Sequence, residues 1–229
     1  MTDLRNLEKK IRITFKDKNL LRQAFVHRSY LNENPSFELP HNERLEFLGD
    51  AVLELVVTYY LYKNYPNPEG ELTNWRSALV KAETLSSVAQ RLGLNKHLLL
   101  SRGETLGNNG RSRQIILANV FEALIGAIYL DRGLEKAKDF IEHSLIVELP
   151  EILKNELYID AKSKFQELAQ EKEGVTPVYS VLKESGPDHE KEFTVGAYLK
   201  DRLIGQGSGP SKQAAQQSAA ADALEKYNK

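Results

Sequence analysis

The sequence predicts two domains: an all-α domain followed by a small α+β domain with the element order α-β-β-β-α. Two observations lead to this prediction. Apolar residues recur at helical spacing through about the first 146 residues, whereas three short segments beyond Pro150 alternate apolar and polar residues as β-strands do. The length of 229 residues also suits one large domain or two modest ones. The expected domains are residues 1–150 and 157–229.

Start and stop signals delimit the helices of the first domain. Asp17 can cap a helix that follows it, and Pro66 and Pro68 forbid continuation of a second. Gly93 is a typical residue just beyond a helix C-terminus. Five helices are expected, over residues 18–25, 41–64, 72–92, 112–130 and 134–146.

The second domain should begin with a helix and end with an Ala-rich helix. Residues 185–188 form a turn signal between the first two strands, and Lys200 and Asp201 join the second and third closely. A hinge is expected near residues 147–158, around Pro150. The expected ranges are 160–171 for the first helix, 177–183, 192–199 and 202–206 for the strands, and 211–227 for the last helix.

Composition excludes several classes of protein. The 31 Lys and Arg residues against 32 Asp and Glu residues give a net charge of −1, so any nucleic-acid binding must come from local patches or from shape. Because there is no cysteine, a disulfide scaffold, a thiolate zinc site and a cysteine nucleophile are excluded. The charged N-terminal segment lacks a signal-peptide core, and the longest apolar stretch is interrupted and too short to span a bilayer. A cytoplasmic protein is expected.

Three acidic residues fall on one face of the helix expected over 41–64. Glu43, Glu46 and Asp50 have the spacing i, i+3 and i+7, which stacks them about 5–6 Å apart. Like charges so placed repel one another, and a divalent cation would reverse that effect. Gly49, which costs about 1 kcal/mol relative to Ala within a helix, indicates close approach of another backbone. The alternative is an ordinary solvated face.

Asn119 and Glu122 are the only polar residues in an otherwise apolar stretch over 115–127. A buried ionised carboxylate costs several kcal/mol unless it is paired or bound to a metal. One interpretation is therefore a salt bridge, for instance to Arg44 or Arg76.

The other interpretation places Glu122 opposite Glu46 and Asp50 across a contact between two helices. Ligands that are all oxygen suit the hard cations Mg²⁺ and Mn²⁺. Such a site can activate a bound water and neutralise a phosphate during its transfer.

These segments resemble the ribonuclease III family over essentially the whole chain. Residues 42–53, with the core ERLEFLGDAVL, resemble the family's signature helix. Residues 116–131 resemble its second catalytic helix, and residues 24–30 resemble its N-terminal motif. The chain is similar to a bacterial enzyme of the small, two-domain class, which has an endonuclease domain and a double-stranded-RNA-binding domain.

The resemblance implies a role for each matching acidic position. Asp50, Glu122 and Glu43 correspond to catalytic carboxylates, and Phe47 corresponds to an aromatic residue that inserts into the partner subunit of a homodimer. The implied cofactor is Mg²⁺, with Mn²⁺ as a substitute. The implied metal ligands are Glu46, Asp50, Asn119 and Glu122.

The implied activity is endonucleolytic hydrolysis of double-stranded RNA, giving 5′-phosphate and 3′-hydroxyl ends with short 3′ overhangs. The resemblance also implies a role in RNA processing, including maturation of ribosomal RNA precursors. One position departs from the family, which usually has Asp where this chain has Asn119. The departure leaves open a dimeric double-stranded-RNA-binding protein with weakened or absent cleavage. A third alternative is an architectural ribosome-associated protein of the same fold.

The second domain offers three surfaces that could face RNA. The first is a polar stripe on the helix over 160–171, and the second is the turn ending in His189. The third is the glycine-rich segment 205–212, where Lys212 and free backbone N–H groups could form an anion site. Each has a plain structural alternative: a solvent-facing surface, a hairpin turn and a helix N-cap, respectively. The stripe consists of Ser163, Gln166, Glu167 and Gln170.

The order of elements resembles the double-stranded-RNA-binding domain. The resemblance implies that the stripe contacts 2′-hydroxyls in one minor groove, His189 reaches the next, and Lys212 contacts phosphates between them, over about 16 bp. The match is incomplete, since the family often has Lys in place of Gln213 and Glu in place of Ala215. Residues 151–229 have 11 basic and 13 acidic residues, so that 11 − 13 = −2, which predicts modest affinity.

Overall fold

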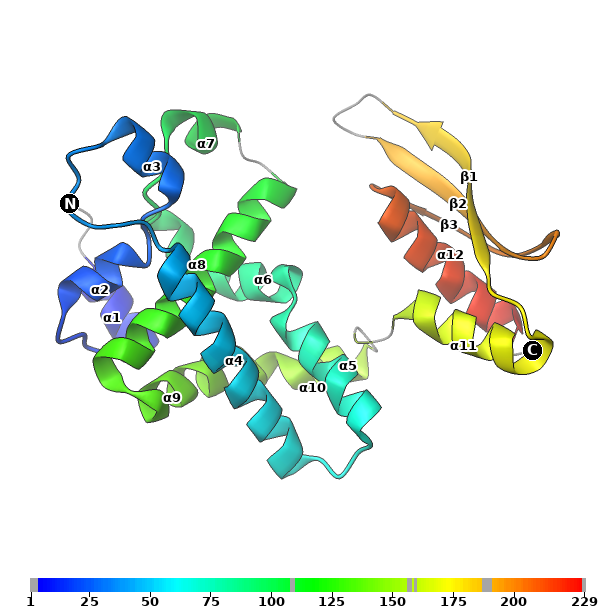
Figure 1. Cartoon of the computed structure of the whole chain (residues 1–229), viewed down its shortest axis with the longest axis horizontal. Helices are drawn as coiled ribbons and strands as arrows, with labels where there is room; N and C mark the ends of the chain where they lie inside the picture. The colour runs from blue at the N-terminus through cyan, green and yellow to red at the C-terminus, as the bar shows by residue number, and fades with distance from the viewer. Residues whose placement is uncertain (1–3, 108–109, 156–157, 159, 187–190, 228–229) are drawn as a thin grey trace. The chain divides into compact units, whose positions relative to one another are not determined.

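The computed structural model describes residues 4–107, 110–155, 158, 160–186 and 191–227. The chain divides into two compact units, Met1–Tyr158 and Ile159–Lys229 (Figure 1). Each unit has a hydrophobic core of its own. The all-α and α-β-β-β-α architectures predicted from the sequence are both observed.

The first unit is helical, and its elements include all the regions where helices were expected. Short 3₁₀ turns occupy Leu94–Lys96 and Ile146–Glu148. The helices are α1 (Arg5–Ile11), α2 (Lys18–Gln23), α3 (Arg28–Glu33), α4 (Glu43–Asn64), α5 (Glu69–Val80), α6 (Ala82–Leu92), α7 (Arg102–Gly107), α8 (Arg111–Arg132), α9 (Leu134–Ser144) and α10 (Leu149–Lys154).

Two sequence predictions about this unit were wrong in detail. The helix expected over 72–92 is two helices, because Lys81 adopts an extended conformation with φ −65° and ψ 149° between α5 and α6. Apolar periodicity continues on both sides of Lys81, so the sequence pattern does not reveal the break. The segment expected as a hinge contains α10, whose Leu149 and Ile152 are buried in the core.

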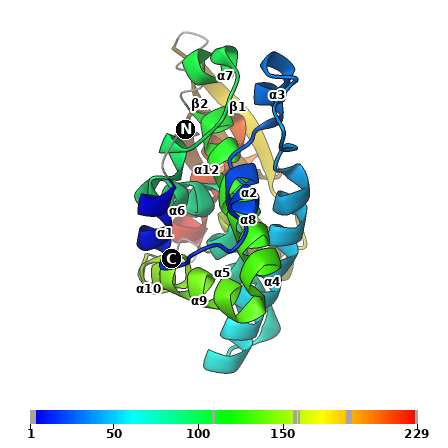
Figure 2. The same cartoon turned by 90° about the vertical axis from the view of Figure 1, so that its left-hand side faces the viewer.

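The central helices α4 and α8 pack backbone against backbone, and they lie side by side in both views (Figures 1 and 2). A Cβ atom at Gly49 would lie 1.8 Å from the carbonyl oxygen of Glu122, and one at Gly126 would lie 2.2 Å from that of Leu45. Only glycine permits this approach, as the mid-helix position of Gly49 predicted. Helix α8 is long and apolar enough to span a membrane by length and composition, but most of its apolar window is buried inside the unit.

The second unit is a three-stranded antiparallel sheet in the order β1-β2-β3, with two helices packed on one face. Lys200, with φ 54°, forms part of the tight turn between β2 and β3. Buried Phe165 and Ala169 of the first helix join the sheet residues in the core. The elements are α11 (Ala161–Glu173), β1 (Val178–Ser185), β2 (Glu192–Leu199), β3 (Arg202–Gly209) and α12 (Lys212–Tyr227).

Candidate active site and nucleic-acid interface

Helices α4 and α8 bring acidic residues from two distant parts of the chain together. The contact at Gly49 sets the backbone of Glu122 directly against α4, between the positions of Glu46 and Asp50. Coulombic repulsion from Asp50 and Glu46 acts on Glu122, so the three carboxylates share one electrostatic environment. The structure therefore places Glu46, Asp50 and Glu122 on the same side of the helix pair. These residues, together with Asn119, are called the acidic centre below.

The surroundings of the acidic centre disfavour the ionised forms of Glu122 and Glu46. Burial raises the pKa of Glu122 to about 8, and the charges of Asp50, Glu46 and Glu54 act in the same direction. Burial also raises the pKa of Glu46, with Glu43 and Asp50 adding to the effect. The fold therefore gathers these acids without stabilising their ionised forms.

Neither Asn119 nor the arginines considered as partners, Arg44 and Arg76, neutralises the charge of these carboxylates. The Asn119 side chain donates a hydrogen bond toward Glu46, which lowers the Glu46 pKa without overcoming the other effects. Within the described residues, neither Arg44 nor Arg76 forms an ion pair with Glu122. Arg76 instead contacts Glu54, at 3.1 Å between its Nε and the carboxylate. The salt-bridge interpretation of Glu122 was therefore wrong.

Glu54 belongs to this electrostatic environment, although the sequence analysis did not single it out. It continues the spacing of Glu43, Glu46 and Asp50 by one further helical turn, which is the signal that could have identified it. Its ion pair with Arg76 distinguishes it from Asp50, for which no ion pair is found within the described part of the chain.

Glu43 lies at the margin of the acidic centre. Its carboxylate is 3.7 Å from the Arg28 guanidinium and 3.7 Å from Nδ1 of His41. Phe47, on the same helix, projects almost fully into solvent, with 81% of its surface exposed. Arg28 and His41 were not predicted as site residues, because the contacts arise from folding of the α3–α4 segment rather than from helix spacing.

The donor chemistry of the acidic centre fits a hard divalent cation. Carboxylate and amide oxygens are the ligands that Mg²⁺ and Mn²⁺ prefer, and a cation would stabilise the ionised forms that the surroundings of Glu122 disfavour. Within the described residues, no three His, Cys, Asp or Glu side chains are yet grouped closely enough to hold an ion.

The predicted polar stripe is exposed on α11, opposite the buried Phe165. Its members Ser163, Gln166, Glu167 and Gln170 all face solvent. The Ser163 hydroxyl donates to Asp160, whose side chain caps the helix, with an oxygen–oxygen distance of 2.7 Å. His189, predicted to contact a second groove, lies outside the described residues.

The predicted anion site around Lys212 is built differently from the expectation. Gly205 and Gly207 belong to strand β3, where added Cβ atoms would lie 2.4 Å from the Ala223 nitrogen and 2.2 Å from the Ala219 nitrogen. These glycines permit close packing of strand and helix rather than forming an open phosphate loop. Lys212 is exposed, but its Nζ lies 3.2 Å from the Glu184 carboxylate.

Both units match known protein families. Residues 17–149 match the family described as "Ribonuclease-III-like", and residues 161–227 match the "Double-stranded RNA binding motif". Together the two matches define the class: an endoribonuclease with a helical nuclease domain and a domain that binds double-stranded RNA.

Individual relatives agree over most of the chain. Ribonuclease 3 of Protochlamydia amoebophila is 49% identical over 95% of this chain and 89% of its own length. Ribonuclease 3 of Nitratiruptor is 45% identical over 98% of this chain and 96% of its own length. The solved nuclease domain of ribonuclease III from Campylobacter jejuni is 41% identical, covers 62% of this chain and 98% of that domain, and gives a TM-score of 0.54. The chain belongs to the ribonuclease III family and is a double-stranded-RNA endoribonuclease.

Proposed function

We propose that this endoribonuclease requires a divalent cation, Mg²⁺ or Mn²⁺, held at the acidic centre. Its products are RNAs with 5′-phosphate and 3′-hydroxyl ends and short 3′ overhangs, and its substrates include ribosomal RNA precursors in the cytoplasm. One observation carries the metal site: Glu122 is partly buried beside Glu46 and Asp50, and no basic side chain pairs with it among the described residues. A family of generally metal-dependent enzymes supports the same proposal.

In this proposal, the residues of the acidic centre have different roles. When bound, the cation would lower the pKa of a coordinated water and neutralise charge on the scissile phosphate. Asp50 and Glu122 hold it from the two helices, and Glu46 contributes a third carboxylate. Asn119 opposes the rise in the Glu46 pKa through its hydrogen bond and offers its amide oxygen as a further ligand. Glu43, at the exposed margin, helps to position the substrate and is the third catalytic carboxylate.

The second unit supplies the RNA contacts in this proposal. Ser163, Gln166, Glu167 and Gln170 are exposed on one helix face and can reach 2′-hydroxyls, while His189 reaches a second groove. Lys212 contacts a phosphate after exchanging its Glu184 partner for the RNA. Since the contacts read shape rather than base identity, the domain should tolerate most duplex sequences.

The exposed apolar face of α4 supports a homodimer. Phe47, Leu55 and Tyr59 are 81%, 59% and 51% exposed at positions i, i+8 and i+12, so they follow one side of the helix. Large apolar side chains gathered on one exposed helix face indicate a surface that a partner covers. A second copy of the chain covers it in our proposal, with Phe47 inserted into the partner. Sedimentation of the wild type and of Phe47→Ala at micromolar concentration tests this.

Cleavage of a long RNA duplex tests the assignment of Glu122. Glu122→Gln removes a metal-binding charge while nearly preserving shape, so cleavage in Mg²⁺ should fall at least about 100-fold. Duplex binding should persist, because the stripe and Lys212 are in the other unit. Glu135→Gln, an exposed acid in the first turn of α9, is the matched control and should cleave normally. Loss of binding together with cleavage would show that Glu122 is structural.

A second candidate is a double-stranded-RNA-binding protein with weakened cleavage. The observation that favours it is Asn119, whose side chain donates to Glu46 and carries no charge for a cation. Cleavage of a long duplex in Mg²⁺ by this chain and by Asn119→Asp separates the two: cutting by the variant only would favour the binding protein, and equal cutting would dismiss it.

A further inference from the structure

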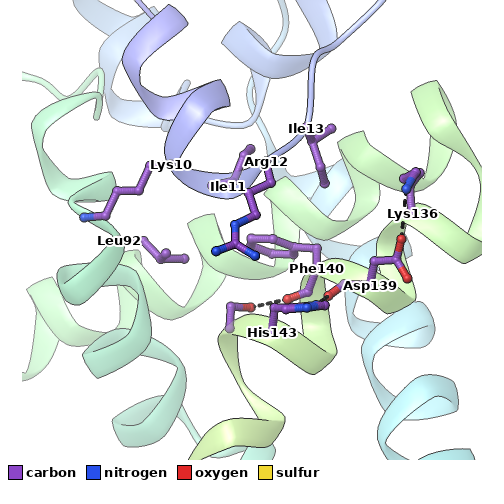
Figure 3. Close-up of a pocket in the computed structure, with 10 residues that line it drawn as sticks. Lys10, Ile11, Arg12, Ile13, Leu92, Lys136, Asp139, Phe140 and His143 are labelled. Atoms are coloured by element: carbon purple, nitrogen blue, oxygen red, sulfur yellow. Dashed lines mark hydrogen bonds and ion pairs between the residues drawn. The ribbon is translucent and has the colours of Figure 1, made fainter.

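The first unit contains a cavity of about 450 Å³ that takes no part in the acidic centre (Figure 3). It lies between the C-terminal end of α1, the end of α6 and one face of α9, and no residue of α4 or α8 lines it. Its volume falls within the range of small-molecule binding sites. The lining residues that matter here are Lys10, Arg12, Ile13, Lys136, Phe140 and His143.

Basic side chains dominate the rim of this cavity. Lys10, Arg12, Lys136 and His143 line it, against a single acid, Asp139. Asp139 is already paired with Lys136, at 2.9 Å between Nζ and the carboxylate. The Lys10 ammonium donates to the Arg91 carbonyl oxygen at 2.6 Å, which holds it in place and leaves further N–H groups. The cavity therefore favours an anion.

Arg12 is the one rim cation in the described residues without a hydrogen-bond or ion-pair partner for its side chain. Its guanidinium points into the cavity, beside Phe140 and above His143 (Figure 3). A guanidinium presents planar, paired donors that match phosphate oxygens. The side chain is thus available and oriented for a phosphate group.

The backbone of Arg12 shows that the position of this side chain is imposed by the fold. Arg12 ends helix α1 in the left-handed conformation, with φ 58° and ψ 31°. Helices α6 and α11 end in the same conformation at Gly93 and Gly174, the residue type that adopts it without strain. An arginine costs about 1–2 kcal/mol there. The fold therefore accepts a conformational cost while holding a guanidinium at the cavity rim.

The inner part of the cavity suits an organic group rather than a bare ion. Ile13 and Phe140 form an apolar floor, both nearly buried. His143 Nδ1 lies 2.7 Å from the Asp139 carbonyl oxygen, which can only accept, so the ring proton sits on Nδ1. Nε2 of His143 remains as an acceptor for a hydroxyl or amino group of a ligand.

We propose that this cavity binds a mononucleotide, whose phosphate contacts Arg12 and Lys10 and whose base packs on the floor formed by Ile13 and Phe140. His143 Nε2 accepts a hydrogen bond from the sugar or from the base. A small concave site with an apolar floor fits a free nucleotide better than a duplex backbone, which needs an open surface. This site is separate from the acidic centre, so the enzyme can sense nucleotides independently of cleavage.

Isothermal titration of the full chain with adenosine 5′-monophosphate in EDTA tests the proposal, because chelation removes any nucleotide binding through a metal. We expect one saturable site per chain and at least about tenfold weaker binding by Arg12→Asn. Asn tolerates the left-handed conformation, so this variant keeps the helix end intact. Lys9→Gln, an exposed cation of α1 outside the cavity, is the matched control and should bind as the wild type does.

Further ligands define which results overturn the proposal. Adenosine should bind more weakly than the nucleotide for lack of a phosphate, and inorganic phosphate more weakly for lack of a base. No saturable nucleotide binding, equal binding by Arg12→Asn, or phosphate binding as tight as the nucleotide would each contradict it. Glu122→Gln should leave nucleotide affinity unchanged, so failure of the metal-site proposal does not affect this test.

Discussion

Two carboxylates of the acidic centre and three carboxylates of the second unit differ in how the fold treats their charge. In the first unit, burial raises the pKa values of Glu46 and Glu122, and neighbouring acids raise them further. In the second unit, the pKa values of Asp160, Glu173 and Asp222 are all lowered. The first set is therefore destabilised as anions, and the second set is stabilised.

In the second unit, hydrogen bonds stabilise the ionised forms of these carboxylates. Burial works against the charge of Asp160, but hydrogen bonds from Gln217, Ser163 and the Lys162 backbone outweigh it. Glu173 accepts hydrogen bonds from the Tyr227 hydroxyl and from Arg202. These acids cap and tie secondary structure together. Glu122, for which no such partner is found among the described residues, is available for a ligand from outside.

The largest effect should come from removing the close approach that creates the acidic centre. In Gly49→Ala the new Cβ would lie 1.8 Å from the Glu122 carbonyl oxygen, so α4 and α8 must separate. We expect the free energy of unfolding of the first unit to fall by about 3 kcal/mol or more. Urea denaturation followed by fluorescence measures this, because Trp75, in that unit, is the only tryptophan in the chain.

Gly70→Ala is the control for helix propensity. Gly70 lies in α5, and an added Cβ there meets nothing within 4 Å. This change should leave stability unchanged or raise it by up to about 1 kcal/mol. Similar losses in both variants would show that the contact between α4 and α8 is less tight than the structure indicates.

The next effect follows from the Glu122 pKa. Because the pKa is raised from 4.5 to about 8 on folding, stability without divalent cations should fall as pH rises between those values. Glu122→Gln should remove this pH dependence and raise the urea midpoint at the alkaline end. Glu173→Gln, which removes a satisfied acid from the second unit, should destabilise that unit instead. Denaturation in EDTA across this pH range measures both; an unchanged profile in Glu122→Gln would contradict the pKa assignment.

Asn119→Asp should sharpen the contrast by adding a charge to the acidic centre. The change removes the hydrogen bond that lowers the Glu46 pKa and adds a carboxylate beside it, so the Glu46 pKa should rise further. Calorimetry should show several-fold tighter Mn²⁺ binding, and cleavage in Mg²⁺ should increase. If Asn119→Asp cleaves the duplex and the wild type does not, the RNA-binding candidate is favoured. Equal cleavage by the wild type and the variant would dismiss it.

The smallest effect is expected at Lys212, an exposed cation already paired with Glu184. Lys212→Ala should weaken duplex binding by about two- to fivefold and reduce the salt slope by about 1, equally for all sequences. Glu184→Gln frees the same cation and should strengthen binding. Duplex affinity measured over a range of salt concentrations checks both variants. A sequence-selective loss in Lys212→Ala would argue against a phosphate contact.

The spacing of apolar residues and the residues typical of helix ends predicted much of the architecture. Asp17 and Gly93 marked helix ends that the structure contains, and alternation marked the three strands. Sequence patterns did not predict the structure where a helix break was short or where packing determined the conformation. Lys81 interrupts a helix without disturbing its apolar periodicity, and the short helices α1, α3, α7 and α10 are too brief to show a period.

By itself, the sequence determined that Glu43, Glu46 and Asp50 share a helix face, because side-chain direction on a helix depends only on spacing. Tertiary structure alone decided that Glu122 meets them with no basic partner in the described part of the chain, and that Arg12 lines a cavity. Both depend on which distant helices approach one another and how closely. Such contacts are decided by packing across the core, where steric fit at positions such as Gly49 outweighs any local pattern.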